Sequence, residues 1–272
     1  MTRLGQALLA LALTGCFGAM HDGRRAMVRG DFEGAARAYR QATAEHPDDA
    51  QAWLALGRAE MAAERYPRAR AALGRCARLR PRAALPRVLI GHSFELQRRY
   101  DDALLAYRQA IEAAPRSAWA HRVMGTRLLR WGRAELAIGP LRRSLELDPT
   151  HAETWNALAL AENAAGDVEA AEADFRRGIE RDPRHPGLRL GLAALLVNTE
   201  RYEAALAIYD DIVRARPSFA PAHVGRAILL HELGREDEAE AAFVEAVRVA
   251  RRPERYRRRL EEYRALRRGR GD

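Results

Sequence analysis

The stretch AQAWLALGRAEMAAERYPRARAALGRCARLRPRA, residues 50–83, decides the fold, because the chain repeats its pattern at the constant interval that separates Pro47 from Pro81. Both prolines and alanines recur at this step. The prolines are Pro47, Pro81, Pro115, Pro149, Pro183 and Pro217, and the alanines are Ala35, Ala69, Ala103, Ala137, Ala171, Ala205 and Ala239. A spacing kept through seven units without an insertion indicates an array of structural repeats.

Each unit has room for two helices of about a dozen residues. Apolar or small residues fall on one helical face in each half of the stretch: Trp53, Leu56 and Gly57 in the first half, and Ala69, Leu73 and Cys76 in the second. The closing proline ends the second helix, because its ring clashes with the preceding turn and its nitrogen carries no hydrogen. One such hairpin cannot bury its apolar face alone, so we expect neighbouring hairpins to stack.

This pattern of tryptophan, leucine, glycine, tyrosine, alanine and closing proline resembles the tetratricopeptide repeat. The resemblance implies an all-α fold, a right-handed α-solenoid of about seven helix hairpins. We expect the array over 16–253, with units at 16–49, 50–83, 84–117, 118–151, 152–185, 186–219 and 220–253. The first unit is weaker, because Ala19, Gly23 and Ala26 stand where large residues are expected.

The large residues of the second helices are predicted to form the core between helices rather than a stacking platform for nucleic acid. They are Tyr39, Leu73, Tyr107, Leu141, Phe175, Tyr209 and Phe243. His121 and His223 replace the tryptophan of the first helix, and we expect both to be half-buried packing residues. Cys76 is expected to be a buried thiol, and Pro140 is expected to kink or loosen its helix.

The first fifteen residues are predicted to be a signal peptide rather than part of the fold. Leu4 to Leu13 is an apolar run of ten residues, and ten helical residues span about 15 Å, half of the roughly 30 Å hydrocarbon core. The sequence Leu13-Thr14-Gly15-Cys16 resembles the lipobox of bacterial lipoproteins. That resemblance implies cleavage before Cys16 and lipidation of its sulfur, with several acyl chains giving a stable membrane anchor.

The net charge of +9 is concentrated at the end of the chain. Residues 251–272 hold ten arginines against four acidic residues, a net charge of +6. A repeat body close to neutral argues against a nucleic-acid partner. The sequence contains no lysine, which excludes a P-loop lysine, a Schiff-base lysine and a lysine general base.

No pattern of a catalytic, metal or cofactor site stands out. The acidic pairs and the eight histidines are scattered, and no HExxH, CxxC, GxSxG or glycine-rich phosphate loop is present. We therefore expect no metal, no cofactor and no enzymatic activity.

The segment 254–272 is expected to be a capping helix followed by a basic tail. An apolar face of Tyr256, Leu260, Tyr263 and Leu266 would cover the last repeat, with the arginines outward. These arginines could bind acidic lipids or an acidic partner, or remain solvated, and we favour the solvated interpretation.

The resemblance also implies a concave groove, lined by the first helices, that binds a peptide or protein segment. The positions carried over are Leu54, Arg58, Met61, Val88, His92, Trp119, Arg122, Thr126, Arg130, Asn156, Leu160, Asn163, Leu190, Val197 and Asn198. Asparagine amides can both donate to and accept from a peptide backbone, and Trp119 is the best single candidate for a binding hot spot.

The sequence therefore predicts a membrane-anchored adaptor that holds a peptide or protein partner. Phe17 after the cysteine, rather than aspartate, implies the outer membrane facing the periplasm if the cell is Gram-negative. Similar small bacterial lipoproteins imply roles such as pilus secretin assembly or the organisation of cell-wall enzymes. Two alternatives stay open: a soluble cytoplasmic scaffold, and an enzyme of the cell envelope.

Overall fold

The computed structural model describes residues 18–269, and all regular secondary structure in that range is helical. This confirms the expected all-α class, an α-solenoid of helix hairpins. The chain divides into two compact units, residues 1–124 and 125–272, with the boundary inside helix α7. The expected signal peptide and Cys16 lie outside the described residues.

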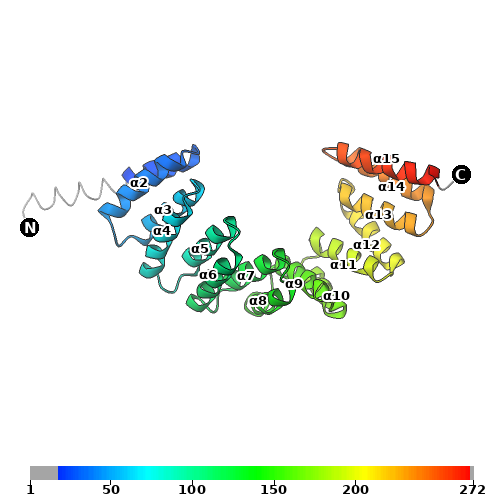
Figure 1. Cartoon of the computed structure of the whole chain (residues 1–272). Helices are drawn as coiled ribbons and strands as arrows, with labels where there is room; N and C mark the ends of the chain where they lie inside the picture. Colours follow the sequence, from blue (N-terminus) through cyan, green and yellow to red (C-terminus); the bar gives the residue numbers. More distant parts are fainter. Residues whose placement is uncertain (1–17, 270–272) are drawn as a thin grey trace, which may run out of the picture. The chain divides into compact units, whose positions relative to one another are not determined.

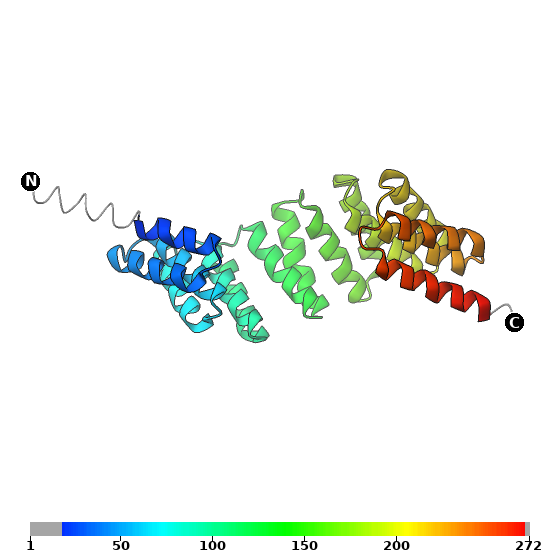
Figure 2. The ribbon, with the colours of Figure 1, turned by 90° about the horizontal axis from the view of Figure 1, so that it is seen from above.

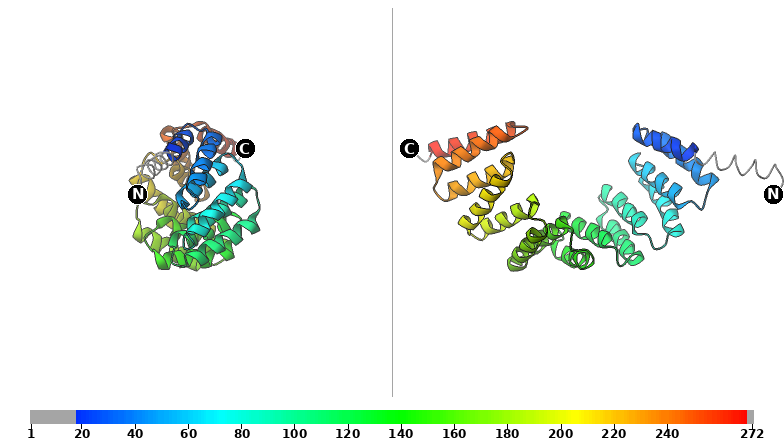
Figure 3. Two further views of the ribbon diagram at one scale, coloured as in Figure 1. Left: turned by 90° about the vertical axis from the view of Figure 1, so that its left-hand side faces the viewer. Right: turned by 180° about the vertical axis from the view of Figure 1, so that it is seen from behind.

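The first unit contains hairpins joined in chain order (Figure 1). A helical segment over residues 18–28 pairs with α2, and Figure 3 shows the two side by side from behind. The helices that follow are α2 (Phe32–Glu45), α3 (Ala50–Ala62), α4 (Tyr66–Leu79), α5 (Ala84–Leu96), α6 (Tyr100–Ala113) and the start of α7 (Ala118–Arg130). Each second helix packs on the next first helix, as α2 does on α3 and α4 on α5.

The second unit repeats this arrangement and adds one more helix. Its helices after α7 are α8 (Ala134–Leu147), α9 (Ala152–Ala164), α10 (Val168–Arg181), α11 (Pro186–Asn198), α12 (Tyr202–Ala215), α13 (Ala220–Glu232), α14 (Glu236–Val249) and α15 (Glu254–Gly269). First helices also contact one another, as α9 contacts α11. Figure 2 shows α15 lying along α14, which it contacts.

The turn inside every repeat contains one residue in the left-handed backbone conformation, always at the same position of the repeat. Four repeats place glycine there, and three place a residue with a side chain. The glycines are Gly30, Gly132, Gly166 and Gly234, and the other residues are Glu64, Arg98 and Glu200, with φ values of 58°, 59° and 59°. Because this conformation costs a non-glycine residue roughly 1–2 kcal/mol, the packing of the helices on either side must impose the turn.

A ring N–H joins the start of each of four first helices to the proline before it. Trp53 Nε1 donates to Pro47 O at 2.9 Å, and Trp155 Nε1 donates to Pro149 O at 2.8 Å. The histidines that replace tryptophan make the same contact: His121 Nε2 lies 3.0 Å from Pro115 O and His223 Nε2 lies 2.7 Å from Pro217 O. Since a carbonyl oxygen only accepts, each Nε2 carries the hydrogen. The histidines are buried rather than half-buried.

The two helices of a hairpin approach closely where a glycine faces the large residue of the second helix. A Cβ added to Gly57 would lie 2.6 Å from Leu73 Cγ, and one added to Gly125 would lie 2.5 Å from Leu141 Cγ. In the fifth repeat Ala159 takes this place, and the Phe175 ring instead lies against Gly191 of the next repeat. All the expected core residues of the second helices are buried, and Cys76 is a buried thiol whose pKa burial raises.

Helix α8 continues through Pro140 from Ala134 to Leu147, so the proline does not end it. The ring sits in mid-helix, where it removes one backbone donor. Leu136, whose carbonyl would have accepted that bond, has a side chain that is 55% exposed. Residue 136 therefore lies on the exposed side of the helix, where water can replace the missing donor.

Two first helices bury a glutamate that pairs with an arginine of the preceding repeat. Arg40 Nε lies 3.3 Å from Glu60 Oε1, and Arg142 Nη2 lies 2.6 Å from Glu162 Oε1. The glutamate side chains are 2% and 1% exposed, and the second carboxylate oxygen of each is buried without a partner among residues 18–269. Burial, and then the neighbouring Asp174, raises the pKa of Glu162, although Arg142 acts in the opposite direction. In three other repeats a buried leucine stands at this position.

The closing helix α15 covers the last repeat, as expected. Leu260 and Tyr263 are buried, and the Tyr263 hydroxyl donates to Glu236 Oε2 at 2.5 Å and lies 2.9 Å from Glu236 O. Leu266 differs from the expectation: it is 61% exposed, because it lies almost a turn beyond the Phe243–Tyr263 contact.

Two arginines of the basic tail are anchored rather than simply solvated. Arg264 pairs with Glu240, and Arg267 pairs with Asp237 and Glu240. These contacts join the outer side of α15 to the start of α14. Within residues 18–269, no helix has both the length and the apolar character needed to cross a membrane.

We expect Glu162→Leu to raise the free energy of unfolding by about 1 kcal/mol or more at pH 7, because it replaces a buried carboxylate by apolar packing while Arg142, which is 55% exposed, keeps its charge in water. A carboxyl with a raised pKa contributes stability below its unfolded pKa and loses it as the pH rises through the folded pKa. The gain should therefore be larger at pH 7 than at pH 4, as measured by urea unfolding. The exposed control Glu112→Leu should change stability little; an equal gain at both pH values would contradict the expectation.

We expect Tyr263→Phe to lower the thermal midpoint by about 2–4 °C at pH 7, because it removes a hydrogen bond to a carboxylate. That bond, and then His231, lowers the pKa of Glu236. The stability that this hydrogen bond provides is present above the unfolded pKa of Glu236 and is lost as the pH falls through the folded pKa. The difference in thermal midpoint between the wild type and the variant should therefore shrink in acid. Tyr256→Phe, at a half-buried tyrosine of the same helix, is the matched control in the same calorimetric scans.

Candidate functional site

The expected groove residues all lie on first helices, but they differ in exposure. Exposed are Arg58 on α3, Trp119 and Arg130 on α7, Leu160 on α9 and Asn198 on α11; half-buried are Leu54, Met61, His92, Arg122, Thr126, Asn156, Asn163, Leu190 and Val197. Val88 on α5 is only 7% exposed. Its side chain packs inside the hairpin array, so it offers almost no surface to a partner.

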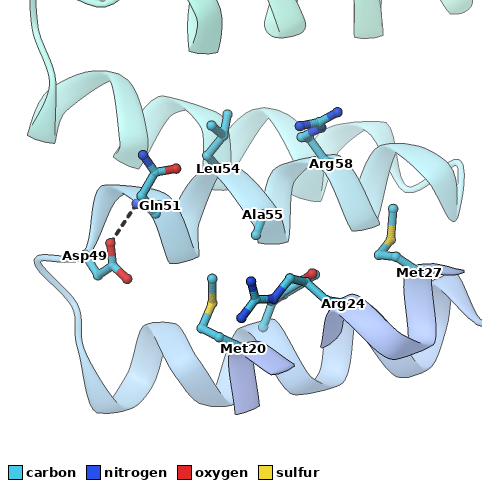
Figure 4. Close-up of a pocket in the computed structure, with 9 residues that line it drawn as sticks. Met20, Arg24, Met27, Asp49, Gln51, Leu54, Ala55 and Arg58 are labelled. Atoms are coloured by element: carbon cyan, nitrogen blue, oxygen red, sulfur yellow. Dashed lines mark hydrogen bonds between the residues drawn. The ribbon is translucent and has the colours of Figure 1, made fainter. Parts of the chain in front are cut away.

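In the first unit, segment 18–28 and α3 enclose a pocket of about 540 Å³, which we call the N-terminal pocket (Figure 4). Its lining residues are Met20, Arg24, Met27, Tyr39, Asp49, Gln51, Leu54, Ala55 and Arg58. Figure 4 shows Met20, Arg24 and Met27 on the side opposite α3. The volume lies in the range of small-ligand and peptide side-chain pockets.

Only Leu54 and Arg58 of this pocket belong to the expected groove. Met20, Arg24 and Met27 were missed, although each lies one repeat before an expected residue: Leu54, Arg58 and Met61 respectively. The step of the repeat could therefore have identified them. The small residues Ala19, Gly23 and Ala26 made the first repeat look weak, yet they occupy its packed face, where all three are buried.

Charge is unevenly distributed around the N-terminal pocket. Asp49 caps α3 by accepting from the Gln51 backbone N–H at 2.8 Å, whereas Arg24 and Arg58 form no ion pair within residues 18–269. Other arginines of the unit do form ion pairs, as Arg40 does with Glu60 and Arg99 with Asp102. The pocket therefore combines an apolar floor with two uncompensated guanidinium groups.

The two guanidinium groups both influence the Tyr39 hydroxyl, which also lines the pocket. Burial raises the pKa of the Tyr39 hydroxyl, while the positive charges of Arg24 and Arg58 both act to lower it. Both side chains are exposed. Both arginines therefore line the N-terminal pocket with side chains that solvent and a ligand can reach.

In the second unit, α15 takes the place that a further first helix would occupy, and a pocket of about 370 Å³ forms between it and the last hairpin. The lining residues are Ile228, His231, Phe243, Arg259, Glu262, Tyr263 and Leu266. None was expected as a site residue. Ile228 and His231 are nevertheless the register equivalents of Arg58 and Met61, further along the array.

Asn156 on α9 is the expected residue with the clearest unmet bonding capacity. Its Oδ1 atom is buried and has no hydrogen-bond partner among residues 18–269. Its Nδ2 atom is 3.6 Å from the place that a Cβ of Gly187 would take, so the amide lies beside the start of α11. Asn163, Leu190, Val197 and Asn198 line none of the pockets described here.

The residues between 18 and 269 bring together no group of three histidine, cysteine, aspartate or glutamate side chains that could hold a metal ion. What the first helices offer is contact surface: apolar floors, amides and guanidinium groups. This surface is suited to binding a polypeptide segment.

Comparison with known families agrees with the repeat pattern. One model, described as a tetratricopeptide repeat, matches residues 23–84, 54–118, 88–152 and 122–186. Two further models with the same description match residues 162–219 and 220–253. No curated protein sequence matches the chain.

Solved structures of similar fold include a tetratricopeptide repeat protein from Parabacteroides merdae, with a TM-score of 0.60, 15% identity, and coverage of 92% of this chain and 99% of that one. The structure of pilF from Pseudomonas aeruginosa has a TM-score of 0.59 and 20% identity, with coverage of 78% and 97%. YrrB, described as having an unusual peptide-binding site, has a TM-score of 0.55 and 22% identity, with coverage of 69% and 97%. At these identities the likeness shows the fold.

Proposed function

Because this chain belongs to the tetratricopeptide repeat family, we propose that it is a membrane-anchored adaptor that binds a peptide or protein segment on the surface of its first helices. The observation that carries the proposal is the open pocket between segment 18–28 and α3, lined by register-equivalent residues of two successive repeats. A surface built by repetition can follow a second chain over several residues, which suits a polypeptide ligand better than a compact metabolite.

Further observations support a polypeptide ligand. Trp119 is 37% exposed on α7, and large aromatic side chains are frequent binding hot spots. Among proteins of similar fold, YrrB is described as having a peptide-binding site.

The anchor is proposed from the sequence. The apolar run before Cys16 is too short to span a bilayer, and the Leu13-Thr14-Gly15-Cys16 sequence resembles a lipobox. If Cys16 is acylated, the N-terminal pocket begins only a few residues after the lipid, since Met20 follows Cys16 closely in the sequence. We propose a location on the outer membrane facing the periplasm, with a role in envelope assembly such as that of pilus secretins or cell-wall enzymes.

To test partner binding, we would place a photoreactive amino acid at Leu54, inside the N-terminal pocket, in cells of the native host. A matched control carries it at Leu105 of α6, an exposed leucine on a second helix. We expect discrete crosslinked protein adducts from position 54 and few from position 105, as detected by immunoblotting and mass spectrometry. Equal adducts from both positions would contradict binding on the first helices.

To test the anchor, Cys16→Ala is compared with the wild type by cell fractionation and by labelling with radioactive palmitate. We expect the wild type in the membrane fraction with label, and the variant without label, because the thiol that accepts the lipid is gone. If both forms were soluble and unlabelled, the cytoplasmic scaffold would be the correct alternative.

A further inference from the structure

We propose that the N-terminal pocket selects a peptide segment in which large apolar side chains stand next to a carboxylate. This inference rests on the proposed function and names the chemistry of the partner. It follows from the apolar residues that line the pocket, from the positive charge of Arg24 and Arg58, and from the lack of an ion-pair partner for either arginine among residues 18–269.

The floor of the pocket fits an apolar side chain. Met20, Met27 and Leu54 supply flexible or branched apolar surface, and Ala55 leaves room between them. Methionine side chains adapt their shape to different apolar ligands. Buried apolar area contributes about 25 cal/mol per Å², so a leucine-sized side chain would provide a useful part of the affinity.

The rim selects a carboxylate by charge. Arg24 and Arg58 line the pocket without an ion-pair partner among the described residues, whereas the only acid of the lining, Asp49, is held at the N-terminus of α3. A guanidinium group can bind a carboxylate through two parallel hydrogen bonds. A ligand carboxylate would therefore gain contacts that a neutral ligand cannot make, and a cationic ligand would be repelled.

The layout also places the two arginines relative to the apolar residues. Figure 4 shows Asp49 and Gln51 at one end of the pocket, Leu54 and Ala55 in the middle, and Arg58 and Met27 at the other end. Figure 4 also shows the nitrogen atoms of Arg24 below Ala55 and beside Met20, so apolar side chains over Leu54 and Ala55 would have a guanidinium group on two sides, one from Arg24 and one from Arg58. The ligand pattern is thus apolar residues flanked by acid, supplied either by a side chain or by a chain terminus.

The test uses the full chain purified in a neutral detergent, with fluorescein-labelled, C-terminally amidated peptides as probes. The reference probe is Gly-Glu-Leu-Leu-Glu-Gly. We compare it by fluorescence anisotropy with the same peptide carrying glutamine for glutamate, lysine for glutamate, or serine for leucine. We expect the reference probe to bind at least about tenfold more tightly than each of the three others. Equal binding of the glutamine and glutamate peptides would overturn the proposal.

The double variant Arg24→Ser with Arg58→Ser should weaken binding of the reference probe by about tenfold or more. The matched control is Arg37→Ser with Arg68→Ser, which removes the same charge from exposed positions of the second helices α2 and α4. It should leave the affinity unchanged. An equal loss in both double variants would show general charge attraction and would overturn the proposal.

Two further arms keep the outcome decisive. The variant Arg24→Lys with Arg58→Lys keeps the charge but cannot form the paired hydrogen bonds, so it should bind the reference probe more weakly than the wild type and more tightly than the serine double variant. Thermal melting should match the wild type for every variant, because all four arginines are exposed. A peptide that ends in leucine with a free carboxylate, and that contains no glutamate, tests whether a terminal carboxylate can replace the glutamate side chain. Displacement of the probe by short-chain phosphatidylglycerol, in the absence of specific peptide discrimination, would assign the pocket to a lipid headgroup instead.

Failure of this proposal is distinguishable from failure of the adaptor function. Crosslinked partners from position 54 without any preference for acidic peptides would leave the adaptor role intact and overturn only the stated specificity. Conversely, a preference for acidic peptides that depends on both arginines would identify the feature to seek in the crosslinked partners.

Discussion

The structure depends on how closely the two helices of each hairpin can approach. Gly57 and Gly125 leave room for the large residue of the second helix, and no Cβ would fit there without displacing Leu73 or Leu141. Once the helices are this close, the turn between them has little freedom, which accounts for left-handed residues at the same place in every repeat. In four repeats, a hydrogen bond from a ring N–H to the preceding proline carbonyl then ties the start of the first helix to the end of the repeat before it.

Much of this arrangement could be predicted from the sequence, because spacing alone specifies it. The constant interval between the prolines predicted the helices and the buried large residues of the second helices. The apolar face after Pro253 predicted the capping helix. The register already placed His121 where Trp53 stands, but the hydrogen bond that the two rings share could not be predicted, since a histidine at a packing position has no distinctive pattern. In the structure both ring nitrogens lie at a proline carbonyl.

The candidate site was harder to predict, because exposure and pairing depend on neighbouring helices. Val88 occupies a groove position in the repeat, but local packing buries it. Arg264 and Arg267 read as solvated charges in a basic tail, but Glu240 lies within reach of both. Conversely, Arg24 was overlooked because the repeat that carries it contains small residues on its packed face. Its place on the pocket follows from simple register, one step before Arg58.

The left-handed turn residues have a consequence for how such a chain can change in length. Glutamate and arginine adopt the same backbone conformation as glycine there, so the conformation belongs to the hairpin and not to one residue type. A duplication of any block that is one repeat long would therefore copy one turn of the same conformation, whether glycine, glutamate or arginine stood in it. The array can gain or lose a module in evolution, or by design, while the turn inside every hairpin keeps its conformation.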